Sequence, residues 1–319
     1  MSFSSDVKEE LSKQVNQARH CRIAELAAII SMCGRIKISE DNRYTLYVHT
    51  ENIMVARKYF TLVKKIYNTS VQVFVRSKSG NKTRQYTLVV KDKDISLKIL
   101  QAAKLINCFG EIEENLSIVN NIVIQNSCCK RAFLRGVFLA TGSISNPEKT
   151  YHFEITAATM PKAVQLQQII TSFHIDAKIV KRKNYYVVYI KEGSQIVDML
   201  NIMEAHVSLM ELENLRILKE MRNSINRKVN CETANISKTV NAASRQIEDI
   251  MFIKNTVGFS ELSDGLRNIA ELRIEYPDMP LKDLGLRLDS PLGKSGVNHR
   301  LRKLSSIAEG IRERLKEEE

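Results

Sequence analysis

Several features are absent from this 319-residue sequence, and each absence narrows its class. Tryptophan does not occur, and there are only 5 prolines and 12 glycines, so long flexible tracts are not expected. No stretch approaches the roughly 20 apolar residues that a membrane span requires. The first residues resemble the start of a capped helix and not a targeting peptide. We expect a cytoplasmic protein with no membrane partner.

Cysteine is also scarce and carries no familiar pattern. The six cysteines are Cys21, Cys33, Cys108, Cys128, Cys129 and Cys231. None belongs to a Cys-x-x-Cys spacing, which favours reduced and packed thiols over disulfides or zinc ligands. Histidine lies far from cysteine along the chain except for His20 beside Cys21, and adjacent residues are expected to point in different directions. The sequence therefore predicts no metal site and no cofactor.

Motifs for other chemistry are missing as well. The chain has no Gly-x-x-x-x-Gly-Lys phosphate loop and no dinucleotide-binding fingerprint. The pairs Gly142-Ser143 and Gly193-Ser194 are interpreted as turns or caps and not as nucleophiles. No catalytic residue is predicted.

Positive charge, in contrast, is abundant. The 48 lysines and arginines exceed the 36 acidic residues, which gives a net charge of +12. The isoelectric point is near 9.4. Such a balance indicates a polyanionic partner, although net charge says nothing about fold.

Two related helical segments, 108 residues apart, are the most informative pattern. Residues 25–34 read ELAAIISMCG and residues 133–142 read FLRGVFLATG, so both are apolar, contain small residues and end in glycine. Strand and helix patterns then recur in one order, near 35–38, 43–50, 52–67, 71–76, 86–90 and 94–107, and again near 151–156, 160–172, 175–191 and 193–203. The predicted fold is α+β, with two α-β-β-α-β-β-α repeats that form a pseudo-twofold, saddle-shaped domain.

A small all-α domain is expected at the C-terminus. Leu262–Tyr276, Leu281–Leu288 and a segment from Ser295 onward are helical in pattern, and a break lies between the last two. Two short helices, a turn and a basic third helix are typical of a helix-turn-helix. The expected domains are a helix in 1–19, repeats in 20–115 and 116–203, a helical linker in 204–255 with a polar stretch at 223–240, and the helix-turn-helix in 256–319.

Both repeats concentrate basic residues at a hairpin. We call this set the basic saddle: Arg76, Lys78, Lys82, Arg84, Lys181, Arg182 and Lys183. Lysine on a hairpin edge also discourages strand pairing, which is the alternative explanation. Recurrence at equivalent places favours a surface that follows phosphates, and the shortage of interleaved aromatic residues favours double-stranded DNA over single strands.

The helix-turn-helix supplies the second set of candidate DNA-binding residues. They are Pro280, Leu281, Lys282, Asp283, Leu284, Gly285, Leu286, Arg287, Leu288, Lys294, Ser295, Gly296, Val297, Asn298, His299, Arg300, Leu301, Arg302, Lys303 and Leu304. Among these, Asn298, His299 and Arg302 are expected to meet base edges, and Lys294 and Lys303 to meet phosphates.

The two glycine-ended segments resemble degenerate copies of the LAGLIDADG motif of homing endonucleases, over roughly residues 20–200. With the C-terminal helix-turn-helix, the chain is similar to the WhiA family of transcription regulators from Gram-positive bacteria. That resemblance implies promoter binding linked to cell division, chromosome segregation or, in spore formers, sporulation. It also implies a location at the nucleoid, and the internal repeat favours a monomer. A protein partner from the transcription machinery, or another regulator, stays open.

The resemblance also identifies where nuclease chemistry is missing. In homing endonucleases a carboxylate just before each motif glycine binds the divalent metals that activate water. The matching residues here are Cys33 and Thr141, and neither is acidic. The sequence therefore predicts a DNA-binding protein that is not an enzyme. The alternatives are an active site-specific endonuclease and an adaptor that holds RNA or acidic proteins.

Overall fold

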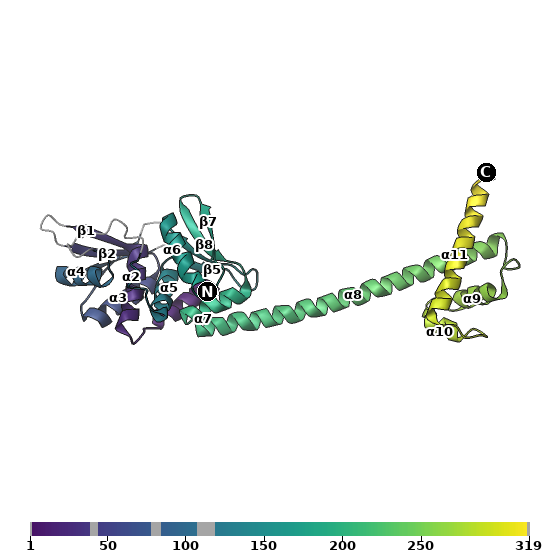
Figure 1. Ribbon diagram of the computed structural model, residues 1–319, viewed down its shortest axis with the longest axis horizontal. Coiled ribbons are helices and arrows are strands. Elements are labelled where there is room, and N and C mark those ends of the chain that lie inside the picture. Colours follow the sequence, from purple (N-terminus) through teal and green to yellow (C-terminus); the bar gives the residue numbers. More distant parts are fainter. Residues whose placement is uncertain (1, 39–43, 78–83, 107–118, 318–319) are drawn as a thin grey trace. The chain divides into compact units, whose positions relative to one another are not determined.

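The computed structural model describes residues 2–38, 44–77, 84–106 and 119–317 (Figure 1). The chain forms two compact units, Met1–Lys219 and Glu220–Glu319. The first unit contains the two predicted repeats, and the second contains the predicted all-α domain.

The first repeat follows α1 (Phe3–Lys13). Its elements are α2 (Arg19–Cys33), β1 (Gly34–Ile38), β2 (Tyr44–Thr50), α3 (Ile53–Tyr67), β3 (Gln72–Ser77), β4 (Arg84–Val90) and α4 (Lys93–Ala102). The strands form an antiparallel sheet in the order β1-β2-β4-β3. Alternate residues on one face of this sheet, including Leu46, Val48, Leu88 and Val90, are fully buried, as expected when helices cover that face.

The second repeat has the same order. Its elements are α5 (Ser127–Thr141), β5 (Gly142–Ile144), β6 (Phe153–Ala157), α6 (Met160–Thr171), β7 (Lys178–Arg182), β8 (Tyr185–Ile190) and α7 (Gly193–Met203). The sheet order β5-β6-β8-β7 matches that of the first repeat position by position. The predicted α+β fold with two α-β-β-α-β-β-α repeats is therefore confirmed.

Helices α2 and α5 pack against each other between the two sheets (Figure 1). A Cβ atom added at Gly136 would lie 2.7 Å from the Glu25 carbonyl oxygen and 2.8 Å from the Ala28 Cβ. The small residues at these two positions therefore set how closely the helices approach. Each helix then leads directly into a strand at Gly34 or Gly142.

A buried ion network crosses the α2–α5 contact. The Glu25 Oε1 atom lies 2.9 Å from Lys58 Nζ on α3 and 2.9 Å from Arg135 Nε on α5. Arg135 also donates to Glu204 Oε2 at 2.6 Å, and Lys58 donates to the Leu11 carbonyl at 3.1 Å. Glu25, Lys58 and Arg135 are all fully buried. The network therefore joins both repeats to α1 and to the end of α7.

Helix α8 (His206–Thr256) spans 51 residues, and it includes the stretch 223–240 that the sequence analysis interpreted as a polar linker. The stretch was expected to be joined to, or partly continuous with, the neighbouring helices, and it is helical throughout. Neither glycine nor proline occurs within α8, so nothing interrupts the backbone hydrogen bonds. Residues 220–242 are all exposed, so this part of the helix forms without a packed face.

The second unit combines the end of α8 with α9 (Asp264–Glu275), α10 (Leu281–Leu286) and α11 (Lys294–Glu317). Its core draws on all four helices, through residues such as Ile253, Ile269, Leu284, Val297 and Leu304. The three predicted helices of the C-terminal domain are confirmed.

Candidate nucleic-acid interface

The exposed side of α11 has a concentrated positive charge. Lys294, Ser295, His299, Arg302 and Lys303 are exposed in the first three turns of this helix. Ser295, His299 and Arg302 lie at i, i+4 and i+7 and therefore share one face. Among the described residues, none of the basic side chains at 294, 302 and 303 forms an ion pair with a carboxylate. Their charges are available to an external anion.

The opposite side of α11 and the buried parts of α10 form the core of the domain. The candidate residues buried there are Leu284, Gly285, Leu288, Val297, Leu301 and Leu304. A Cβ atom at Gly285 would lie 2.1 Å from the Leu292 carbonyl oxygen, so this glycine lets the turn pack onto α10. These six residues support the exposed face and are not themselves accessible.

Two arginines among the candidates are already engaged within the domain. Arg300 Nη1 donates to the Gly265 carbonyl oxygen at 3.1 Å. The guanidinium of Arg287 lies 4.2 Å from the centre of the Tyr276 ring. Both arginines stabilise the fold, whereas Arg302 projects into solvent. The sequence alone could not separate these roles because all three are basic residues near the turn.

The first sheet presents a second cationic surface on the face that turns away from the helices. Alternation along the strands brings Arg35, Lys37 and Arg76 to this face together with three rings. The three rings are Tyr47, His49 and Phe74, and all six residues line one shallow cavity. We call these six residues the first-sheet face. Arg35 and Lys37 were missed by the sequence analysis because they lie outside the hairpin where charge was most dense.

The pKa of His49 is affected by the positive charge of the first-sheet face. Partial burial lowers the pKa of His49, and the nearby positive charges of Arg35 and Arg76 lower it further. Its Nδ1 lies 3.0 Å from Thr87 Oγ1 on the neighbouring strand. The histidine is therefore a neutral member of a cationic surface near pH 7.

The described residues of the basic saddle do not all lie on the same face of their sheets. Arg76 pairs with Gln85 across β3 and β4, so the adjacent Arg84 belongs to the other face of the sheet. Lys78 and Lys82 lie outside the described residues. In the second repeat, Arg182 faces outward, whereas Lys181 pairs with Tyr186 on the helix-facing side and Lys183 occupies the turn.

The second sheet is less cationic than its hairpin sequence indicates. Arg182 Nη1 forms an ion pair with Glu154 Oε2 at 2.9 Å, and His152 Nε2 lies 3.1 Å from the same oxygen. Glu154 belongs to β6, so a count of charges within 178–191 could not include it. The two repeats thus share a fold but carry different charge on their outer faces.

Lysines occupy the ends of α2 and α5, near the positions of the nuclease carboxylates. A cavity of about 280 Å³ there is lined by residues that include Ser31, Gly34, Thr141 and Lys162. Lys162 donates a hydrogen bond to the Ser31 carbonyl. Burial lowers the pKa of Lys8 to about 8 and that of Lys162 to about 8, and the Cys33 thiol is the nearby titrating group for both. Burial raises the pKa of Cys33 to about 11, so the thiol is neutral at pH 7.

Acidic residues that could have replaced the lost carboxylates are engaged elsewhere. Glu25 belongs to the buried network with Lys58 and Arg135. Glu154 pairs with Arg182 on the outer face of the second sheet. Glu40 and Asp41 lie outside the described residues. The described ends of α2 and α5 therefore present ammonium groups where a metal-dependent nuclease needs anionic oxygens.

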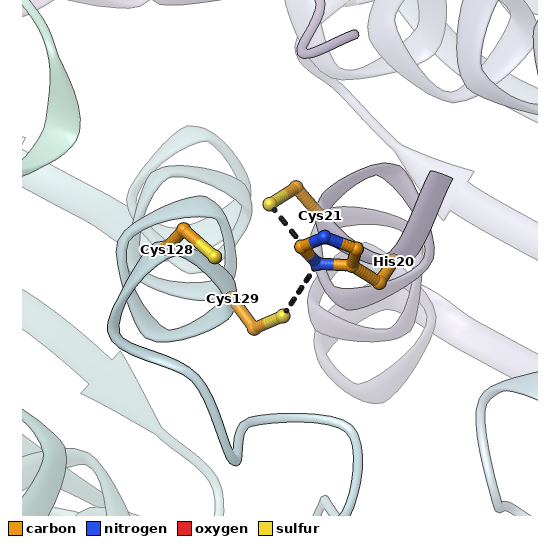
Figure 2. A group of neighbouring side chains, drawn as sticks. All are labelled: His20, Cys21, Cys128 and Cys129. Carbon is orange, nitrogen blue, oxygen red and sulfur yellow. Dashed lines mark hydrogen bonds between the residues drawn. The ribbon is translucent and has the colours of Figure 1, made fainter. Parts of the chain in front are cut away.

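One cluster contradicts the expectation that histidine and cysteine stay apart. Figure 2 shows His20 and Cys21 of α2 gathered with Cys128 and Cys129 of α5. One possible ligand atom from each residue lies within 4.8 Å of those of the other three. Successive residues on a helix point in directions about 100° apart around its axis. In each pair, however, the two residues lie on either side of the direction that faces the other helix, so both side chains reach the space between the helices. Burial raises the pKa of the Cys21 thiol to about 12, and the neighbouring Cys128 and Cys129 thiols add to this effect.

Comparison with known proteins matches three family models to this chain. Residues 19–106 match the WhiA N-terminal LAGLIDADG-like domain, 130–222 the WhiA LAGLIDADG-like domain, and 225–308 the WhiA C-terminal HTH domain. The chain belongs to the WhiA family.

Relatives of this family match along the full chain. A probable cell division protein WhiA from Lachnoclostridium phytofermentans is 59% identical over 98% of this chain and 100% of its own length. One from Alkaliphilus oremlandii is 48% identical over 98% of both chains. The crystal structure of full-length WhiA from Thermatoga maritima matches with a TM-score of 0.59 and 25% identity, over 97% of this chain and 98% of that chain. The resemblance stated from the sequence is thereby confirmed.

No helix in the described part of the chain combines the length and apolar character that crossing a bilayer demands.

Proposed function

We propose that this chain is a sequence-specific DNA-binding regulator of transcription that acts in cell division. Its α11 would read base edges in the major groove, and its first-sheet face would contact phosphates. Double-stranded DNA is the proposed partner, at the nucleoid in the cytoplasm, and the internal repeat favours a monomer. Roles in chromosome segregation and, in spore formers, sporulation belong to the same proposal, as does contact with the transcription machinery or another regulator.

The observation that carries this proposal is the division of α11 into two sides. Val297, Leu301 and Leu304 anchor one side in the core, which fixes the direction of the other. The exposed side offers Ser295, His299 and Arg302 along one line, flanked by lysines. Arginine can bind the O6 and N7 atoms of guanine with two hydrogen bonds, so Arg302 is the strongest candidate for base recognition. The names of the relatives, which are cell division proteins, support the biological setting.

The first-sheet face supports a second, sequence-independent contact. Arg35, Lys37 and Arg76 present three cations on one face, and each phosphate that they neutralise would release counterions. We propose that this face contributes more to phosphate binding than the second sheet, where Glu154 already pairs with Arg182. The first repeat would therefore make most of the phosphate contacts that the sequence assigned to both hairpins of the basic saddle.

We also propose that the protein does not cleave DNA. Cys33 and Thr141 replace the motif carboxylates, and the ammonium groups of Lys8 and Lys162 approach Cys33. A cationic environment of this kind repels the hard divalent ions that phosphodiester hydrolysis uses. Incubation of supercoiled plasmid with the chain and Mg²⁺ or Mn²⁺ tests this second proposal. Nicking that disappears in a Lys162→Ala or Cys33→Ala variant would reverse it.

The DNA-reading role is tested by binding to two duplexes. The preferred sequence is first selected from a random library, and affinity is then measured for that duplex and for a scrambled one of equal length. Arg302→Ala should weaken binding to the selected duplex by roughly 5- to 150-fold, equivalent to about 1–3 kcal/mol, and change binding to the scrambled duplex much less.

Arg314→Ala is the matched control for this experiment. Arg314 is exposed on the same helix but lies 12 residues further along, about 18 Å from Arg302. The control should bind both duplexes like the unmodified chain. Equal losses on both duplexes for Arg302→Ala would mean that this arginine contacts phosphate and does not read sequence.

A further inference from the structure

The cluster of His20, Cys21, Cys128 and Cys129 has the composition of a metal site. Three thiols and one imidazole are brought together from the first turns of α2 and α5 (Figure 2). His20 Nδ1 lies 3.1 Å from Cys129 Sγ and 3.4 Å from Cys21 Sγ. Cys21 and Cys129 are buried, whereas His20 and Cys128 are exposed, so an ion could enter from solvent and be held on its inner side.

The spacing of these atoms fits tetrahedral zinc. In such a site the Zn–S distance is about 2.3 Å, which places neighbouring ligand atoms about 3.8 Å apart. The four ligand atoms here already lie within 4.8 Å of one another, so small side-chain rotations would complete the geometry. Thiolate and imidazole are soft or borderline ligands that select Zn²⁺ over Mg²⁺ or Ca²⁺.

The backbone around the cluster also suits a negatively charged metal complex. Helix α2 begins at Arg19 and α5 begins at Ser127, and neither N-terminus is capped by a side-chain hydrogen bond. The free N–H groups and the positive end of each helix dipole stabilise nearby negative charge. Three thiolates on Zn²⁺ carry a net charge of −1, so two uncapped helix N-termini suit this complex better than they suit an empty cluster.

We propose that His20, Cys21, Cys128 and Cys129 bind one Zn²⁺ ion in a structural site that joins the two repeats. Each repeat contributes two ligands, so the ion forms a cross-link between residues that are more than 100 positions apart in sequence. The site lies at the N-terminal ends of α2 and α5, about 20 Å from the glycine ends where a nuclease would hold its metals. All four coordination positions are taken by protein atoms, which leaves none for a water molecule and indicates a structural role.

The test begins with the metal content of the purified full chain under reducing conditions. After reconstitution with ZnCl₂ and removal of unbound ion, elemental analysis should give one zinc per chain. Substitution with Co²⁺ should produce the visible ligand-field bands of a tetrahedral site together with sulfur-to-cobalt charge-transfer bands. A six-coordinate Co²⁺ spectrum, or no bound zinc, would overturn the proposal.

Two groups of variants make the result specific to this cluster. Cys128→Ser and His20→Gln change exposed ligands and should each reduce the affinity for zinc at least 10-fold. Cys33→Ser and Cys231→Ser alter cysteines outside the cluster and should retain one zinc per chain. If Cys128→Ser and His20→Gln retained full affinity while circular dichroism showed native helix content, the assignment of these ligands would be wrong.

The same samples distinguish zinc from a disulfide. Alkylation of the folded, metal-free chain without reductant should label the exposed Cys128, and zinc should protect it from labelling. After denaturation of the metal-free chain, Cys21, Cys128 and Cys129 should all be labelled as free thiols. A mass 2 Da lower than that of the reduced chain, with a linked pair of peptides from α2 and α5, would identify a disulfide in place of the proposed metal site. Chelation should also lower the thermal midpoint of the unmodified chain by several degrees and leave that of Cys128→Ser unchanged.

Discussion

The buried ion network at Glu25 gives the sharpest test of what holds the two repeats together. In the folded chain Glu25 and Glu204 balance the charges of Lys58 and Arg135. Replacement of Glu25 by glutamine keeps the size of the side chain but removes one negative charge. Arg135 Nε can still donate to the amide oxygen, whereas Lys58 and Arg135 then share a single, partly exposed carboxylate on Glu204.

The magnitude follows from the burial of these groups. Two charge-assisted contacts of 2.9 Å end at Glu25 Oε1, and each such hydrogen bond contributes about 1.5–3 kcal/mol. Removal of one partner from a fully buried ion pair costs about 3–5 kcal/mol, because an uncompensated charge stays in the interior. With an m-value of about 2–3 kcal/mol/M for a unit of this size, the urea midpoint should fall by about 1–2 M.

The effect should also depend on pH in a defined direction. Burial lowers the pKa of Lys58, whereas the charge of Glu25 opposes that shift. Glu25→Gln should therefore depress the pKa of Lys58 further. The unfolded chain then binds more protons than the folded chain at pH values between the folded and unfolded pKa of this lysine, so the stability of the variant rises as pH increases through that window. The destabilisation measured at pH 9.5 should be smaller than that measured at pH 7.

The assay is urea unfolding of the full chain by circular dichroism, with hydrogen exchange of α2 and α5 peptides to assign the transition to the first unit. Glu9→Gln is the control, because Glu9 forms an exposed i,i+4 pair with Lys13 and should have little effect. The double variant Glu25→Gln with Lys58→Met removes one charge of each sign and should be more stable than Glu25→Gln alone. An unchanged urea midpoint for Glu25→Gln, or a double variant less stable than the single one, would refute the reasoning.

Three further outcomes can be measured on the full chain. Gly136→Ala should destabilise the fold by roughly 1–3 kcal/mol in thermal unfolding, because its Cβ would lie 2.7 Å from a carbonyl oxygen. Gly310→Ala should instead be stabilising by up to about 1 kcal/mol, because nothing lies within 4 Å of its Cβ. A change of the same sign at both sites would contradict this explanation. The pKa of Lys162 is lowered to about 8, against 10.5 in the unfolded chain, so the unfolded chain binds more protons between these pH values and stability should rise across this window. Lys162→Met should therefore reduce the rise in the urea midpoint between pH 8 and 10.5. Identical pH profiles for the variant and the unmodified chain would show that Lys162 titrates normally. Arg76→Ala should reduce the slope of log affinity for DNA against log salt concentration by about 0.9. Arg182→Ala should change this slope less, because Arg182 is already paired with Glu154. A larger change for Arg182→Ala than for Arg76→Ala would identify the second sheet as the main phosphate contact.

Local pattern was enough to predict most of the fold. The strands and helices of each repeat follow from apolar periodicity, and their recurrence after Gly34 and Gly142 supports each assignment through the other. For the stretch 223–240, the polar composition left open how far the helix continues, and the structure has one unbroken helix there. Helix propensity without a buried face leaves no apolar period for sequence analysis to detect.

Contacts between distant segments could not be predicted from composition. Glu154 reaches Arg182 only because β6 and β8 pair, and Arg35 joins Arg76 only because four strands align in register. The convergence of His20 with Cys129 likewise depends on how α2 and α5 cross. In each case the residues are close in three dimensions but distant along the chain, and a single sequence does not contain that information.

The ion pair between Glu154 and Arg182 has a consequence for the charge symmetry of the first unit. A homodimer built from one such repeat would carry identical charge on its left and right halves, and it could bind a duplex equally well in either orientation. Here both halves lie on a single polypeptide and can differ in sequence, so the outer face of the first sheet carries Arg35, Lys37 and Arg76, whereas Arg182 on the second sheet is paired with Glu154. The two outer faces therefore differ in charge, and we expect a polyanion that lies across both sheets to bind more favourably in one of its two directions.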